Sequence, residues 1–110
     1  MKKNTVFIEN AGACLVSKNI LTKRAKLRWC FREKSMAAVD NGWRFLSEID
    51  TDEYLSEADN FSVCDFNTVA RIEPAVLLIY DMEVGTDLEL VVNDGKKYFA
   101  DASSGEILNI

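Results

Sequence analysis

The stretch KLRWCFREKSMAAVDNGWRFLS, residues 26–47, decides the fold. At its start, apolar side chains alternate with basic ones, and this period of two predicts a β-strand. The alternation places Leu27, Trp29 and Phe31 on the inner face of that strand. Cys30 and the basic side chains are expected on the outer face.

The end of the same stretch predicts a second strand. Its Asp-Asn-Gly run is a turn signal, because Asn and Gly tolerate a positive φ, and Gly42 is expected to need one. Trp43 and Phe45 then share the inner face of the following strand, so both are predicted core residues. Arg44 points the other way and is expected to pair with a carboxylate. The two strands form a predicted β-hairpin with a long connection, residues 34–41.

Two short helices are predicted further along the chain. The first begins after Asp50 or Thr51, either of which can cap it. The second covers Phe66–Ile72, and the carboxylate of Asp65 is expected to cap it by accepting hydrogen bonds from free N–H groups of the first turn. Pro74 disfavours helical geometry in the residue before it and so ends this helix.

The remaining apolar runs predict further strands. The run AVLLIY at residues 75–80 fits either a buried strand or a turn of buried helix. The other expected strands are residues 5–8, 13–17, 61–64, 88–92 and 96–100, with an edge strand at 107–108. The fold class is therefore α+β, with a mainly antiparallel sheet of about six to eight strands built from hairpins.

Length and composition are typical of one globular domain. The chain has 110 residues, 48% hydrophobic and 28% charged, and residues 1–110 are expected to bury a core without a disulfide or a metal. Cys14, Cys30 and Cys64 are few and widely spaced, which predicts reduced thiols. The apolar run near the N-terminus is too short for a signal peptide, so we expect a cytoplasmic protein without a membrane anchor.

Several kinds of chemistry are missing from the sequence. The chain has no histidine, the commonest general base and metal ligand. It has no G-x-S-x-G or S-x-x-K motif and no glycine-rich phosphate loop. We therefore expect no catalytic residues, no cofactor and no metal, and a protein that is not an enzyme.

Charge is divided unevenly along the chain. Residues 1–44 carry ten basic and three acidic side chains, whereas residues 45–110 carry three basic and fifteen acidic ones. Residues 48–59 form an acidic segment without Lys or Arg. Such a segment suits a cationic protein partner, because complementary charge raises the association rate and selects the partner. Tyr54, within this segment, is the residue expected to anchor the interface with the partner. The candidate interface residues are Glu48, Asp50, Asp52, Glu53, Tyr54, Glu57 and Asp59.

Two other interpretations remain open. The basic segment 18–34 could bind nucleic acid or another anionic ligand through Lys26, Arg28 and Arg32. The sequence pI of about 4.7 makes nucleic acid an unlikely partner. The chain could also be a structural or interaction module that dimerises through an exposed edge strand.

The order of several short motifs resembles a bacterial family of immunity proteins of polymorphic toxin systems, the immunity family numbered thirty-three, formerly a domain of unknown function. The motifs that carry the resemblance are ACLVS (13–17), FRE (31–33), DNGWRF (40–45), DEY (52–54), DN (59–60), DFNT (65–68) with Pro74, and VGT (84–86). The chain departs from the family pattern in two places. Lys34 and Ser35 stand where a proline is expected, and residues 77–83 contain no proline.

The resemblance implies a function in protein binding. It implies a cytoplasmic protein that binds a cognate toxin and blocks it, with no catalysis and no cofactor. The acidic segment and the missing catalytic set are consistent with that implication.

Overall fold

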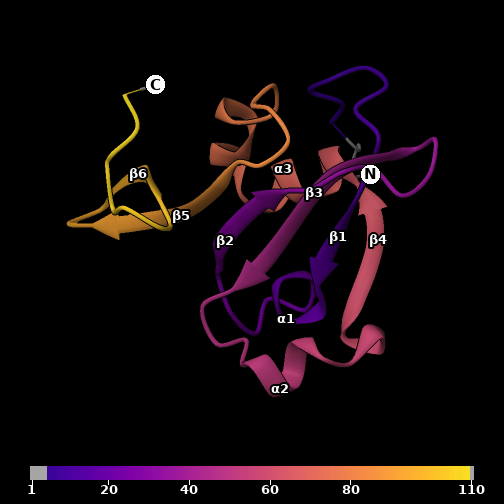
Figure 1. Ribbon diagram of the computed structural model, residues 1–110, viewed down its shortest axis with the longest axis horizontal. Helices are drawn as coiled ribbons and strands as arrows, with labels where there is room; N and C mark the ends of the chain where they lie inside the picture. The colour runs from indigo at the N-terminus through magenta and orange to yellow at the C-terminus, as the bar shows by residue number, and fades with distance from the viewer. Residues whose placement is uncertain (1–4, 110) are drawn as a thin grey trace.

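A single six-stranded sheet, in the strand order β4-β1-β3-β2-β5-β6, organises the computed structural model, which describes residues 5–109 (Figure 1). β1 and β3 run parallel, and every other neighbouring pair is antiparallel. The α+β class and the mainly antiparallel sheet are therefore confirmed. The strands are β1 (Ala13–Ser17), β2 (Leu27–Arg32), β3 (Asp40–Ser47), β4 (Phe61–Asp65), β5 (Asp87–Asn93) and β6 (Lys96–Asp101).

The described chain contains more helix than the sequence predicted. Its α-helices are α1 (Lys18–Leu21), α2 (Asp52–Leu55) and α3 (Phe66–Ile72), and its 3-10 helices are η1 (Ala58–Asn60) and η2 (Pro74–Leu78). The expectation of two helices missed α1, which begins where the side chain of Ser17 accepts a hydrogen bond from the N–H of Asn19. The open question at residues 75–80 is resolved in favour of helix, because η2 covers most of that run.

The predicted inner face of β2 is wrong beyond Leu27. Leu27 pairs with Ser47, but the next pair is Trp29 with Leu46, so β2 advances by two residues where β3 advances by one. Arg28 is therefore an extra residue in a β-bulge. A one-residue insertion moves all later side chains to the other face of a sheet. Cys30 is consequently fully buried, while Trp29 and Phe31 are half-buried on the opposite face.

The core lies between the sheet and the helices α1, α3 and η2. Trp43 and Phe45 are fully buried, which confirms the prediction for both, and their rings are stacked 6.0 Å apart. Phe66, the first residue of α3, lies 5.9 Å from the ring of Phe45 and 4.7 Å from the ring of Tyr80. Aromatic contacts thus join the central strand to the helical layer.

Two predicted strands are not formed. Residues 5–8 are instead held by two side chains of α3: Asn67 accepts from the N–H groups of Phe7 and Ile8 and donates to the carbonyl of Ile8, and Arg71 donates to the carbonyl of Thr5. The expected edge strand at residues 107–108 is reduced to a single bridge between Ala100 and Ile107. The predicted hairpin of β5 and β6 is confirmed over its full length.

Gly42 is required by the contact between β3 and the end of β2. Its φ is +87°, as the turn signal predicted, although it lies within β3 and not in a free turn. A Cβ at this position would lie 2.1 Å from the carbonyl oxygen of Glu33. The N–H of Glu33 donates to the carbonyl of Gly42, so the two backbones meet where only glycine fits.

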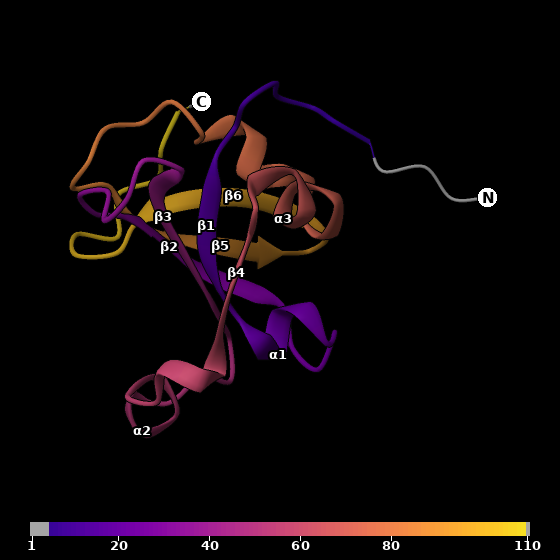
Figure 2. The same cartoon turned by 90° about the vertical axis from the view of Figure 1, so that its right-hand side faces the viewer.

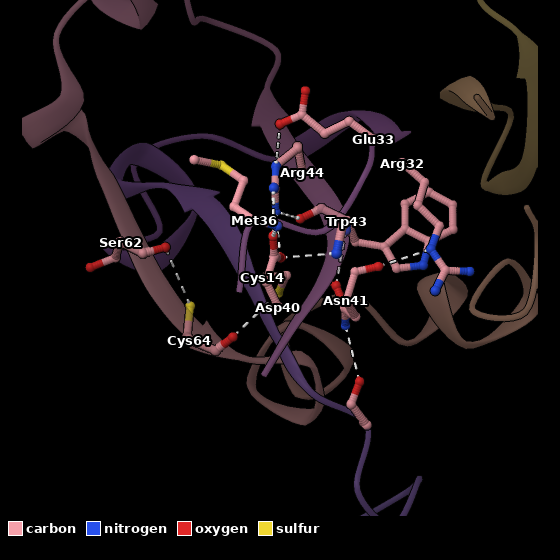
Figure 3. Close-up of polar contacts among 12 residues, drawn as sticks. Cys14, Arg32, Glu33, Met36, Asp40, Asn41, Trp43, Arg44, Ser62 and Cys64 are labelled. Carbon is pink, nitrogen blue, oxygen red and sulfur yellow. Dashed lines mark hydrogen bonds and ion pairs between the residues drawn. The ribbon is translucent and has the colours of Figure 1, made fainter. Parts of the chain in front are cut away.

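Arg44 is buried on the face of β3 opposite Trp43 (Figure 3). Only 2% of the residue is exposed, and its guanidinium donates to the carboxylates of Glu33 and Asp40 and to the carbonyl of Trp43. It forms a bidentate salt bridge of 2.8 and 2.9 Å with the carboxylate of Asp40, and its Nε donates to the carboxylate of Glu33 at 2.6 Å. The expected pairing of Arg44 with a carboxylate is confirmed. The guanidinium also holds the pKa of Asp40 well below its usual range.

We predict that Gly42→Ala strongly destabilises the fold, because the new methyl group must displace backbone and adopt a positive φ. The expected loss is above about 2 kcal/mol in the free energy of unfolding, measured by urea titration. Gly95→Ala is the matched control, because Gly95 also has a positive φ but nothing lies within 4 Å of its added Cβ. Equal losses in the two variants would contradict the steric explanation.

Candidate protein-binding surface

The acidic segment, residues 48–59, projects from one end of the sheet. Figure 2 shows α2 at the tip of this projection, away from the helices that cover the core. Asp52, Glu53, Glu57 and Asp59 are all exposed. The structure thus places four of the seven predicted interface residues on one protruding surface.

Asp50 has a different role from the predicted one. It is half-buried and its carboxylate accepts hydrogen bonds from Asn19 Nδ2 at 2.8 Å and from both the N–H and the hydroxyl of Ser47 at 2.7 Å. Burial acts to raise its pKa, but these hydrogen bonds outweigh burial and hold the pKa below its usual value. Asp50 therefore joins α1 to the end of β3 and fixes the root of the acidic segment.

The tip of the segment is a single capped turn. The hydroxyl of Thr51 accepts from the N–H of Tyr54 at 3.1 Å, so Thr51 is the N-cap of α2. Asn60 Nδ2 donates to the carbonyl of Tyr54 at 2.7 Å and closes the loop. Tyr54 is half-buried, so less of its ring is available to a partner than the sequence suggested.

Among residues 5–109, the exposed carboxylates at the tip form no ion pair. None of the ion pairs within residues 5–109 includes Asp52, Glu53, Glu57 or Asp59. Glu48 forms no ion pair with the described residues either, but its carboxylate is engaged within the fold, because it accepts a hydrogen bond from the backbone N–H of Lys26 at 3.0 Å. The tip therefore keeps its negative charge available for a partner.

The predicted basic row is divided among separate contacts. Arg28 pairs with Glu89 at 2.7 Å, and its guanidinium lies 5.1 Å from the ring centre of Trp29. Arg32 donates to the carbonyl of Asn41 (Figure 3) and also to the carbonyl of Met82. Two of the three cations proposed to bind an anion are thus engaged within the fold. The nucleic-acid hypothesis stays a prediction with reduced physical support.

Three other residues of the basic segment border a groove on the helical side. Its volume is about 1030 Å³, and Lys23, Arg24 and Lys26 form part of its wall. Lys97 also lines it but is paired with Glu73 at 2.8 Å. Arg71 is a fifth cation of this lining, which also contains the two carboxylates Glu48 and Glu73 and several apolar side chains. Binding of an anionic ligand in this groove stays a prediction.

Sequence reasoning missed the hollow that the bulge creates. Trp29, Phe31 and Leu46 line a depression of about 560 Å³ on the face opposite the core. No residue pattern marks a bulge at Arg28, so simple alternation assigned Trp29 and Phe31 to the wrong face.

The predicted structural residue Asp65 is confirmed as the N-cap of α3, because it accepts from the N–H of Asn67 at 2.7 Å.

Two further findings concern residues 5–109. No group of three or more His, Cys, Asp or Glu side chains there is arranged to hold a metal ion. No helix in that range has both the length and the apolar character needed to cross a membrane.

We predict that Asp50 makes folding stability sensitive to acid. Its pKa is lowered by folding, so its contribution is present above the unfolded value of about 3.9 and is lost as the pH falls through the folded pKa. Asp50→Asn should therefore flatten the fall of unfolding free energy below about pH 4, measured by urea titration across pH. Asp52→Asn, an exposed control, should keep the wild-type slope. Identical slopes in wild type and Asp50→Asn would refute the role of this carboxylate.

Comparison with known proteins identifies the family. The model of the Immunity protein Imm33 domain matches residues 14–101, a range that includes the whole acidic segment and five complete strands after the start of β1. No curated protein and no solved structure matches the chain. The matched range covers most of the sequence, as the motif order predicted, and the chain belongs to the Imm33 immunity protein family.

Proposed function

We propose that this protein binds a cognate bacterial toxin through the tip of the acidic segment and neutralises it. Membership of the Imm33 family implies a toxin-neutralising binding role. The observation that carries the choice of surface is the exposure of Asp52, Glu53, Glu57 and Asp59 without a cationic neighbour among the described residues.

The geometry of the tip supports recognition by charge. A protruding surface with several unpaired carboxylates attracts a cationic partner from a distance and orients it before contact. The hydrogen bonds of Asp50 and the cap at Thr51 hold the segment in one conformation, so little conformational entropy is lost on binding. The partner is therefore a toxin domain with a basic surface.

Inhibition by binding requires no chemistry from this chain. The sequence supplies no histidine, and we propose that neutralisation depends on occupying the toxin surface alone. The three cysteines are free thiols, which fits action in a reducing compartment such as the cytoplasm.

We predict that reversing the charge of the tip slows toxin association. The variant is Asp52→Lys with Glu53→Lys and Glu57→Lys, and Asp50 is left intact because it stabilises the fold. The association rate with the cognate toxin should fall about tenfold or more at low salt, and it should lose its salt dependence. Surface-immobilised binding kinetics measure both quantities, and toxin-challenged growth measures protection.

A matched control separates the tip from general charge effects. Asp81→Lys with Glu83→Lys and Glu106→Lys changes the same number of exposed carboxylates elsewhere on the chain. It should leave the association rate close to that of wild type. A tip variant that associates at the wild-type rate would exclude this surface, and a wild-type chain that does not bind or protect would exclude the function itself.

A further inference from the structure

β4 is an edge strand with a free side. Among the described strands it pairs only with β1, in an unbroken antiparallel register from Ala13–Asp65 to Ser17–Phe61. Figure 1 shows β4 at the outer border of the sheet, on the side opposite β5 and β6. The free side is therefore open to a further strand.

The backbone groups that face outward follow from the pairing. The N–H of Phe66 donates to the carbonyl of Gly12 at 3.0 Å, one step beyond the β1–β4 ladder. Hydrogen-bonded and non-hydrogen-bonded pairs alternate in antiparallel strands, so Cys14–Cys64 is a bonded pair and Leu15–Val63 is not. The N–H and carbonyl of Val63 therefore point away from β1.

Phe61 and Asp65 lie two residues before and after Val63 in β4, so they too belong to pairs that are not hydrogen-bonded to β1. The N–H of Asp65 and the carbonyl of Phe61 also point to the free side. The N–H of Phe61 is already engaged, since it donates to the carbonyl of Ala58. Among residues 5–109, no backbone partner is found for the outward groups of Val63.

β4 carries none of the usual protection of an edge strand. Proteins protect edges with lysines, prolines, bulges or a covering segment, because an open edge pairs with other chains. The other edge, β6, begins with Lys96 and Lys97 and is partly covered where Leu108 donates to Phe99. The sequence of β4, FSVCD, contains no lysine or proline, and its register with β1 contains no bulge.

Exposed apolar side chains lie on β4 and on the neighbouring face of the sheet. Val63, at the centre of β4, is 71% exposed, and Val39, in the β2–β3 connection, is 69% exposed. These two valines line one hollow of about 520 Å³ together with Ala13 and Ala38. This hollow lies over β1, between β4 and the β2–β3 connection, whereas a strand added at the free side of β4 would pack beside Val63 and satisfy its outward backbone groups.

We propose that a second copy of this chain occupies the edge, so that two β4 strands pair antiparallel about a two-fold axis at Val63. In this register Val63 lies opposite Val63 of the second copy, and Phe61 lies opposite Asp65. The two valines exchange a pair of backbone hydrogen bonds, and each Asp65 N–H donates to a Phe61 carbonyl across the axis. The two sheets become one continuous sheet.

A second copy fits the chemistry of this edge. A two-fold interface must be self-complementary, and β4 is apolar at its centre with its one charge near an end. The register places no like charges opposite each other, because Asp65 faces Phe61. The carboxylate of Asp65 is also engaged with Asn67 in the cap of α3. The acidic segment contributes no residue to the pairing, so this inference stands apart from the proposed function.

The test is the oligomeric state of the whole chain without toxin. Sedimentation equilibrium from low micromolar to millimolar concentration should show a monomer–dimer equilibrium for the wild type. Val63→Lys should shift the chain to monomer, because a lysine protects an edge strand. Val84→Lys is the matched control, since Val84 is 56% exposed in a loop outside the sheet, and it should dimerise as the wild type does.

Hydrogen exchange of the wild type supplies a measurement that needs no variant. The amides of Val63 and Asp65 should exchange slowly at high concentration and rapidly on dilution, whereas the Cys64 amide should be protected at both. A chain that is monomeric throughout would overturn the proposal, as would a dimer that persists in Val63→Lys. Protection of Val63 only when toxin is added would assign the edge to the toxin and equally overturn pairing between copies.

Discussion

The buried guanidinium of Arg44 is the constraint on which the sheet and its connections depend. A charge that is 2% exposed is tolerated only when every donor has an acceptor, because an unpaired buried charge costs several kcal/mol. Asp40 supplies two of those acceptors and lies at the start of the same strand. Asp40 also accepts from the N–H groups of Met36 and Gly42, so one carboxylate orders both the long connection and the strand that follows it.

The same strand connects the core to the functional end of the molecule. β3 pairs with both β1 and β2 and carries Trp43 and Phe45 toward the helices. Its last residue, Ser47, donates twice to Asp50. The acidic segment therefore begins from the most firmly held strand in the sheet, which allows a protruding and highly charged turn to keep a defined shape.

Charge is used in two distinct ways in this chain. Arg28 and Arg44 are paired with carboxylates, and Arg32 donates to backbone carbonyls, so these three arginines of the N-terminal half serve the fold. The acidic excess of the C-terminal half is not neutralised at the tip of the segment. A net charge of −5 thus becomes a local anionic surface, which is the property an inhibitor of a basic protein requires.

Local sequence signals determined much of the structure. The cap at Asp65, the need for glycine at position 42, the β5–β6 hairpin and the buried pair Trp43 and Phe45 each follow from residues close in sequence, and each is confirmed. The motif order likewise indicated the family before any geometry was known. Capping, turn geometry and strand periodicity are short-range effects, so a single sequence carries them.

Tertiary structure alone decided the rest. The bulge at Arg28 reverses the two faces of β2 because the register with β3, and not the local pattern, sets which side chains are buried. Asp50 looked like part of an acidic surface, but Asn19 and Ser47 make it a structural acceptor. β4 is an edge strand because β1 lies between β4 and β3 and no described strand pairs with the other side of β4, a long-range arrangement that no local signal encodes.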